Sequence, residues 1–303
     1  PLPLKRSFFE YHALTRQAQR DPGRVPEVYH FDEGQALTVM EYLSPHRILR
    51  RDLEAGVRHE NLAEQLGNFI ARTAFRGSDL AMKTADRKAD VALFCDNVAL
   101  CDITEQLVFT DPYYSAKLNR HTSPQLDGLV AELRADVDLK VAAQQMLLKF
   151  CNHAETLVHG DLHTGSIMAH GGDARVIDPE FAVYGPFGFD VGMLIANFLM
   201  AYFAQAGHER APGERDDYRA WTLDVAEGED EAAVGVDHGP CAAMRRLDAA
   251  AARDLDDDGM AQSAPSVDRT VPALPERLAQ LRLEDFSRAR ERQRLGAQRH
   301  RAR

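Results

Sequence analysis

Two short segments near the middle of the sequence carry the side chains that phosphoryl transfer requires. The first reads His159-Gly160-Asp161-Leu162-His163-Thr164-Gly165-Ser166, and the second reads Val176-Ile177-Asp178-Pro179-Glu180. In phosphoryl transfer a loop carboxylate orients the attacking hydroxyl, and metal ions held by further carboxylates neutralise the phosphate charge. The pattern therefore predicts that Asp161 contacts a substrate hydroxyl and that Asp178 and Glu180 hold Mg²⁺ through hard oxygen ligands.

Each of these residues also has an ordinary structural interpretation. A single aspartate such as Asp161 is most often a turn or cap residue, and only its spacing from the carboxylate pair favours chemistry. His159 and His163 stand four positions apart but outside any predicted helix, so they need not converge on a metal ion. Because carboxylates suit Mg²⁺ better than imidazoles, we expect a structural role for both histidines.

The elements that must position these segments follow from the apolar periodicity. Spacing of three and four residues predicts helices over residues 7–19, 62–73, 99–110, 124–153 and 190–206. Apolar runs on either side of a turn at Glu33-Gly34 predict strands over residues 28–31 and 36–40. Residues 175–178 read as a short buried strand that ends in a carboxylate. The apolar run from Met193 to Phe203 predicts a buried helix, since it is too short for a membrane span and Asn197 interrupts it.

The composition indicates which binding partners and which cellular compartment to expect. The chain has 303 residues and a formal net charge of -11, so non-specific nucleic-acid binding is not expected. Cys95, Cys101, Cys151 and Cys241 form no Cys-x-x-Cys pair, and the first residues contain no apolar signal core. Scattered reduced thiols are typical of a cytosolic protein, so we expect a cytoplasmic location and no membrane partner.

The first segment resembles the catalytic loop of the aminoglycoside-phosphotransferase and choline-kinase group, most of which has Asn where this chain has Ser166. The combination of Ser166, Asp178-Pro179-Glu180 and residues 181–190 is similar to the methylthioribose kinases, as are residues 101–105 and 109–112. The resemblance implies an α+β, protein-kinase-like fold with a truncated N-lobe and a mainly helical C-lobe. It also implies ATP and Mg²⁺ as cofactors, and phosphorylation of the sugar 1-hydroxyl of S-methyl-5-thioribose in methionine salvage.

The same resemblance implies roles for individual residues. Asp161 would be the catalytic, substrate-contacting aspartate, while Asp178, Pro179 and Glu180 would face Mg-ATP. The backbone of the segment Glu41-Tyr42-Leu43 would be the hinge that binds adenine. Four residues would support the site: Glu10 as the glutamate of the N-lobe helix, Asp190 as the brace of the catalytic loop, and His159 and Ser166 within that loop.

The departures from the family pattern divide the chain into three expected parts. No glycine-rich loop and no strand lysine precede Glu10, and Lys5 lies too close to it. We therefore expect residues 1–43 to be a remnant of the N-lobe with the hinge, and residues 44–222 to be the helical C-lobe with the catalytic and metal loops. Residues 223–303 contain Phe286 as their only aromatic residue and are rich in Ala, Asp and Arg, which predicts an atypical, disordered tail with one weak helix around residues 275–295. This change of composition is interpreted as a reading-frame slip.

Other functions remain open at this point. The chain could be a catalytically impaired fragment of the kinase, because the phosphate loop and strand lysine are missing, or a related phosphotransferase of the aminoglycoside or choline type. A metallophosphoesterase motif also begins like Gly160-Asp161-Leu162-His163, but the Gly-Asn-His segment that it requires is absent from the sequence. The expected partners are a small sugar and ATP, with a homodimer implied by the family; Arg245-Arg246 does not match the setting of the arginine pair that grips the sugar in this family.

Overall fold

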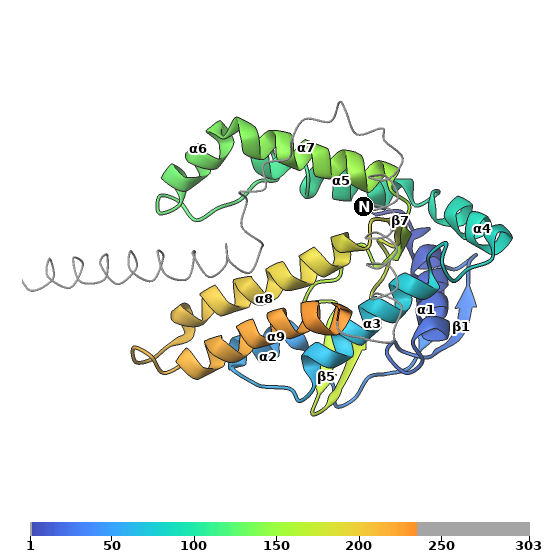
Figure 1. The fold of residues 1–303 in the computed structure, drawn as a ribbon, viewed down its shortest axis with the longest axis horizontal. Helices are drawn as coiled ribbons and strands as arrows, with labels where there is room; N and C mark the ends of the chain where they lie inside the picture. The colour runs from blue at the N-terminus through green and yellow to red at the C-terminus, as the bar shows by residue number, and fades with distance from the viewer. Residues whose placement is uncertain (1, 235–303) are drawn as a thin grey trace, which may run out of the picture. The chain divides into compact units, whose positions relative to one another are not determined.

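The fold is described from a computed structural model, which covers residues 2–234, with side chains through residue 226. These residues belong to one unit, Pro1–Leu247. The second unit, Asp248–Arg303, and the helix expected around residues 275–295 lie outside the described residues. The described part mixes helices with three small antiparallel sheets, which confirms the predicted α+β class (Figure 1).

The chain begins with a helix and a β-hairpin, as the sequence predicts. Helix α1 (Arg6–Arg20) buries Phe9, Ala13 and Leu14, which lie on one face at helical spacing. It ends at Arg20, and Asp21 follows as the C-cap before the Pro22-Gly23 turn. Strands β1 (Val28–Asp32) and β2 (Leu37–Met40) then pair in antiparallel fashion.

Helices make up most of the remaining described chain. They are α2 (Leu49–Ala55), α3 (Leu62–Arg76), α4 (Thr84–Phe94), α5 (Val98–Leu107), α6 (Asp127–Ala135), α7 (Val137–Asn152), α8 (Gly188–His208) and α9 (Asp216–Val234), with a 3₁₀ turn at Asp111–Tyr113. Helix α9 runs across the boundary expected between residues 222 and 223.

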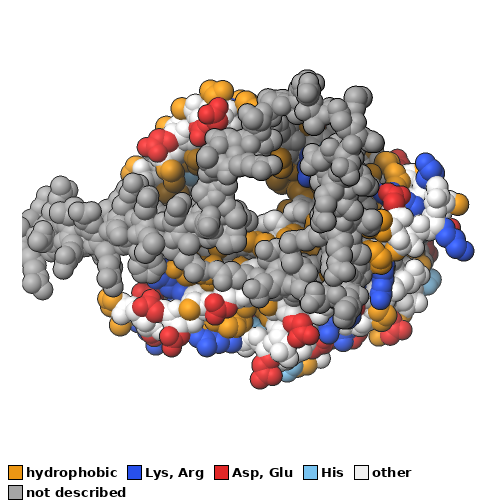
Figure 2. Space-filling view, in the orientation of Figure 1, with side chains coloured by type: hydrophobic (Ala, Val, Ile, Leu, Met, Phe, Trp, Pro, Cys, Tyr) orange, Lys and Arg blue, Asp and Glu red, His pale blue; other side chains and the backbone are white. Residues whose placement is uncertain are grey.

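The prediction of a single helix over residues 124–153 is wrong in one respect, because the structure has two helices there. The break falls at Asp136, whose carboxylate accepts a hydrogen bond from the Leu139 N–H at 2.9 Å and so caps α7. The apolar residues of this region also face solvent more than expected. Those that are exposed on α6 and α7 are Leu129, Leu133, Val137, Val141, Met146 and Leu148. Figure 2 shows hydrophobic side chains scattered among charged ones where the described residues are visible.

Five short strands build two further sheets around the segments of interest. Strands β3 (Arg47–Ile48), β5 (Ile167–His170) and β6 (Asp173–Val176) form one sheet in the order β3-β5-β6. Strands β4 (Thr156–Val158) and β7 (Val183–Gly185) form the other. The chain crosses from the second sheet to the first through residues 159–166, and it returns through residues 177–182. The two crossings therefore run between the same pair of sheets.

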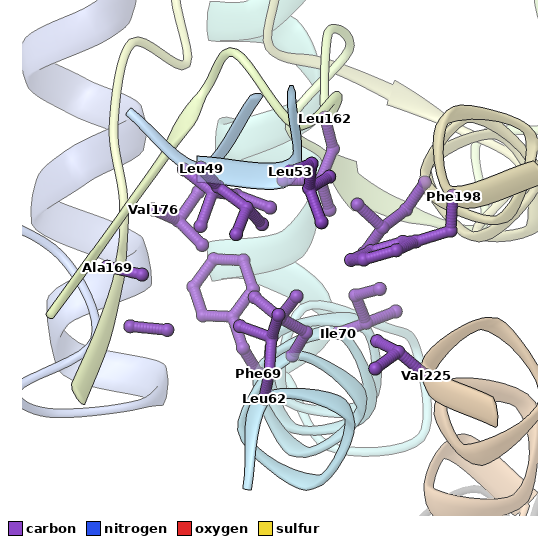
Figure 3. Close-up of a cluster of buried hydrophobic side chains, with 14 of the residues drawn as sticks. Leu49, Leu53, Leu62, Phe69, Ile70, Leu162, Ala169, Val176, Phe198 and Val225 are labelled. Carbon is purple, nitrogen blue, oxygen red and sulfur yellow. The ribbon is translucent and has the colours of Figure 1, made fainter. Parts of the chain in front are cut away.

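A large apolar cluster holds the β3-β5-β6 sheet against the helices. Phe69 and Ile70 of α3, Phe198 of α8 and Val225 of α9 point into it together with Leu162 of the first crossing (Figure 3). Phe198 is fully buried, and burying a side chain of this size contributes about 2–3 kcal/mol. The first crossing is thus attached to the core by Leu162, one residue after Asp161.

Helix α8 differs from the buried helix that the sequence predicts. Leu194 and Phe198 are fully buried, whereas Met200 and Phe203 are 58% and 65% exposed. By length and composition alone α8 could cross a membrane, a test that core helices also pass. Its buried face packs in the apolar cluster, so the described structure accounts for α8 as a half-buried core helix.

A second apolar cluster fixes α1 beside the site. Phe9 and Ala13 of α1 contact Phe94 of α4, and the cluster also contains Ala182 and Tyr184. Phe94 is fully buried. Because Ala182 belongs to the second crossing, this cluster sets the distance between the start of α1 and the carboxylate pair.

Candidate functional site

The structure brings the two segments together through hydrogen bonds between the crossings. The Ile177 N–H donates to the Ser166 carbonyl at 2.9 Å. The Ile177 carbonyl accepts a hydrogen bond from Nε2 of His159, also at 2.9 Å. As a result Asp161 and Asp178 are close enough to interact electrostatically.

His159 is a structural residue of the loop. Its ring is buried, and burial lowers its pKa to about 4, so the ring is neutral near pH 7. Nε2 donates to the Ile177 carbonyl, while Nδ1 accepts from the Asp161 N–H at 3.2 Å. Both ring nitrogens are therefore occupied by backbone groups and neither is available to a metal ion.

His163 and Ser166 shape the surroundings of Asp161. Nδ1 of His163 accepts from the Gly165 N–H at 3.0 Å, so a proton on the neutral ring lies on Nε2. This Nε2 lies 3.5 Å from Oδ2 of Asp161. The Ser166 hydroxyl donates to the Asp161 carbonyl at 2.9 Å. Burial raises the pKa of Asp161, His163 lowers it, and the Asp178 carboxylate raises it.

Asp190, at the start of α8, holds the backbone of the same loop. Its carboxylate accepts the His159 N–H at 2.6 Å and the Gly160 N–H at 3.0 Å. Burial raises the pKa of Asp190 to about 6. Gly160 has φ +83°, and a Cβ there would lie 2.2 Å from the Phe181 carbonyl oxygen, so only glycine fits. The close approach of Gly160 to the Phe181 carbonyl joins the two crossings at a second point.

The carboxylate pair of the second crossing is held from both sides. Asp178 has φ 64°, a left-handed conformation that aspartate tolerates better than most residues. The Glu180 carbonyl accepts from Nδ2 of Asn97 at 2.9 Å. The Glu180 carboxylate accepts from Nη1 of Arg6 at 3.1 and 2.8 Å. Burial and the nearby Asp178 raise the pKa of Glu180, while Arg6 lowers it.

This donor set fits a magnesium ion that is only partly coordinated by protein. Within residues 2–234, His, Cys, Asp and Glu side chains do not gather in threes at a metal-binding distance. Mg²⁺ is commonly bound by one or two carboxylates, with phosphate oxygens and water completing the shell. Asp178 and Glu180 supply two hard oxygen ligands, and the guanidinium on Glu180 shows that a cation is stable at this position.

Glu10 faces the same carboxylates from α1. Burial raises its pKa to about 7, with Asp178 and Glu180 adding to the effect and Arg6 opposing it. Glu10 makes no ion pair within the described residues, although the family pattern places a lysine opposite it. The structure thus puts Glu10 beside the metal-binding candidates.

The expected hinge follows strand β2. The Glu41 N–H donates to the Glu27 carbonyl at 2.8 Å, and the Glu41 carboxylate accepts the Glu27 N–H at 3.2 Å. Leu43 is buried, whereas Tyr42 is 90% exposed. In the described chain neither Tyr42 nor Leu43 uses its backbone in a hydrogen bond, so those groups are available to a ligand.

Three residues of the site were missed in the sequence. Arg6 stands one helical turn before Glu10 and could have been found from that spacing. Asn97 binds the Glu180 and Ala182 carbonyls from more than eighty positions away, and no local pattern predicts it. Arg50 donates its N–H to the Thr164 carbonyl at 3.0 Å and lowers the pKa of Asp161.

Comparisons with known proteins identify relatives of this chain. Methylthioribose kinase 1 of Oryza sativa subsp. japonica is 46% identical over 228 residues, which are 75% of this chain and 53% of the relative. A methylthioribose kinase of Escherichia coli O45:K1 (strain S88 / ExPEC) is 46% identical over 74% of this chain and 54% of its own length. One of Bacillus pumilus (strain SAFR-032) is 44% identical over 69% and 53%. The chain spans about half the length of the curated relatives it matches.

Solved structures and a family model complete the comparison. A glucosamine kinase in complex with glucosamine, ADP and inorganic phosphate has a TM-score of 0.44 and 17% identity, over 75% of this chain and 56% of that one. The model described as "Phosphotransferase enzyme family" matches residues 1–228 of the 303. The chain therefore belongs to the phosphotransferase enzyme family.

Proposed function

We propose that this chain carries the phosphoryl-transfer site of a kinase that uses Mg-ATP to phosphorylate the sugar 1-hydroxyl of methylthioribose. The observation that carries the proposal is the pairing of the two crossings, which sets Asp161 beside Asp178 and Glu180. Identities of 44–46% to proteins named methylthioribose kinase support the choice of substrate. This chain matches about half the length of the relative, so the complete reaction is proposed for the full-length protein.

In this proposal Asp161 accepts or orients the proton of the substrate hydroxyl. Partial burial and a raised pKa make its carboxylate a better base than an exposed aspartate. The Nε2 side of His163 lies near Oδ2 and fixes the direction of the carboxylate. Asp190 and Ser166 hold the loop backbone, so Asp161 is positioned before the substrate arrives.

Asp178 and Glu180 would hold the magnesium ion, and the backbone of Glu41, Tyr42 and Leu43 would bind adenine. When bound, the metal neutralises charge on the phosphates. The unused backbone groups of Tyr42 and Leu43 support the hinge assignment. Glu10 lies near Asp178 and Glu180, so it would lie next to the nucleotide phosphates.

The cellular setting is proposed from the relatives and the composition. The family resemblance implies methionine salvage as the setting of the reaction, and the scattered cysteines favour the cytoplasm. A homodimer is expected from the family resemblance, and light scattering of the purified chain tests it.

The proposal is tested by calorimetry with Mg-ATP and by a phosphorylation assay with methylthioribose. Replacement D161N should lower turnover by about 10²–10⁴-fold, the usual contribution of a general base, while leaving nucleotide affinity within about twofold. D217N, at an exposed position on α9, is the matched control and should change neither quantity. Nucleotide binding without any transfer by the wild-type chain would identify an impaired fragment, and no binding of Mg-ATP would refute the proposed site.

A further inference from the structure

Arg6 makes an unusual contact for a residue at the start of a surface helix. Its Nη1 lies 3.1 and 2.8 Å from the two carboxylate oxygens of Glu180. The Glu180 side chain is 11% exposed and the Arg6 side chain 44% exposed. Arg6 is separated from Glu180 by 174 positions, so the contact is made by the packing of α1 and not by local chain geometry.

Neighbouring basic residues at and after the start of α1 pair with other carboxylates and not with Glu180. Lys5, its neighbour, pairs with Asp96 on the α4–α5 connection. Arg16 donates to both carboxylate oxygens of Asp90, at 2.9 and 2.6 Å. Within residues 2–234 only Nη1 of the Arg6 guanidinium has a partner, and Nε and Nη2 remain available to an oxyanion.

Glu180 does not need Arg6 to keep its backbone in place. Asn97 donates to the carbonyls of Glu180 and Ala182 at 2.9 and 3.0 Å. Ala182 is also fully buried in the cluster around Phe94. The Arg6 contact therefore acts on the carboxylate alone, at the position where a divalent cation would bind.

We propose that Arg6 is a resident cation of the carboxylate pair, which a divalent cation displaces from Glu180 and which then binds the phosphate chain of the nucleotide. This inference rests on the proposed function, because it assigns the carboxylate pair to a metal–nucleotide complex. A guanidinium on a half-exposed side chain can leave one carboxylate at small cost, and its fork of donors matches phosphate oxygens. Arg6 would thus provide a positive charge on the α1 side of the site, near Glu10.

If a divalent cation displaces Arg6 from Glu180, removing Arg6 should change two affinities in opposite directions. Removing the Arg6 charge removes a competitor and a repelling cation, so a divalent cation alone should bind more tightly. The same change removes a phosphate contact, so the metal–nucleotide complex should bind more weakly. A residue that only supports the fold would weaken both.

The experiment uses the full chain and three variants. Mn²⁺ binding without nucleotide is measured by electron paramagnetic resonance, and binding of the Mn²⁺ complex of a non-hydrolysable ATP analogue is measured by calorimetry. We expect R6M to bind Mn²⁺ about two- to fivefold more tightly and the nucleotide complex about two- to fivefold more weakly, the range of a partly exposed ion pair. R6K should lie between R6M and the wild type. The control K5M, which loses the neighbouring ion pair to Asp96, should match the wild type in both.

The outcomes separate the inference from the proposed function. Weaker Mn²⁺ binding by R6M would overturn displacement, and unchanged nucleotide binding would overturn the phosphate contact. A wild-type chain that binds Mn²⁺ but no nucleotide would refute the proposed function, and the metal-only comparison would still decide whether Arg6 competes for Glu180.

Discussion

Replacing Asp190 by alanine tests the anchor of the loop at residues 159–166 without reference to any substrate. The Asp190 carboxylate accepts hydrogen bonds from the N–H groups of His159 and Gly160 in a buried position. Leaving two buried N–H groups without a partner costs about 1–3 kcal/mol each, or about 4 kcal/mol together. At pH 8 part of this loss is offset, because the variant no longer buries an ionised carboxylate.

The size of the offset follows from the pKa of Asp190, which burial raises from 3.8 to about 6. A difference of this size corresponds to about 3 kcal/mol in favour of the protonated form. Since the folded pKa is raised, the stability that Asp190 contributes by binding a proton is complete below about pH 4 and is lost as the pH rises through 6. The expected loss of unfolding free energy in D190A is therefore about 1 kcal/mol at pH 8 and about 2 kcal/mol at pH 5.

The assay is urea denaturation followed by circular dichroism at both pH values. D102A, at an exposed position on α5, is the control and should stay within about 0.5 kcal/mol of the wild type at either pH. A loss in D190A that is equal at the two pH values, or larger at pH 8, would refute the reasoning, because the buried carboxylate would then not carry the raised pKa.

Three further replacements test other parts of the site. Burial raises the pKa of Glu10 to about 7, so its stabilising proton is lost as the pH rises through 7; E10Q should raise the melting temperature at pH 8 and not at pH 5, and a lower value at pH 8 would contradict this. G160A, with its Cβ 2.2 Å from the Phe181 carbonyl, should lose about 4 kcal/mol or fail to fold, whereas G23A, with φ +77° but nothing within 4 Å, should lose only about 1–2 kcal/mol in the same denaturation; equal losses would show that the close contact is not limiting. F94A should lose about 3–5 kcal/mol, since this ring is fully buried between α1 and the second crossing, and a loss below about 1 kcal/mol would speak against that packing.

Much of the site was predictable because its carboxylates lie in short segments with strong spacing. Asp161 and the pair at Asp178 and Glu180 were found from their types and separation, and the structure places the two segments against each other. The α+β class was implied by the family resemblance, while helical periodicity and short apolar runs predicted individual helices and strands. The assigned catalytic and metal-binding roles remain predictions that the proposed experiments test.

The remaining features depend on contacts between distant parts of the chain. Apolar spacing on α6 and α7 predicts a buried face. The spacing shows that the apolar residues share one face, but it does not show whether another element packs against that face. Leu129 and Leu133 are in fact exposed. The break at Asp136 contains neither Gly nor Pro, so only the capping ability of Asp could have indicated it. The contacts of Arg6 and Asn97 with residue Glu180 arise from packing across the fold.

The anchor at Asp190 also has a consequence for the order in which the chain folds during translation. Residues 159–166 leave the ribosome before Asp190, which holds the N–H groups of His159 and Gly160. Leu162 likewise packs in a cluster that includes Leu194 and Phe198 of α8. A nascent chain that ends before Gly188 therefore contains Asp161 but lacks the groups that fix its loop, and the loop reaches its final geometry only after α8 has been synthesised and packed.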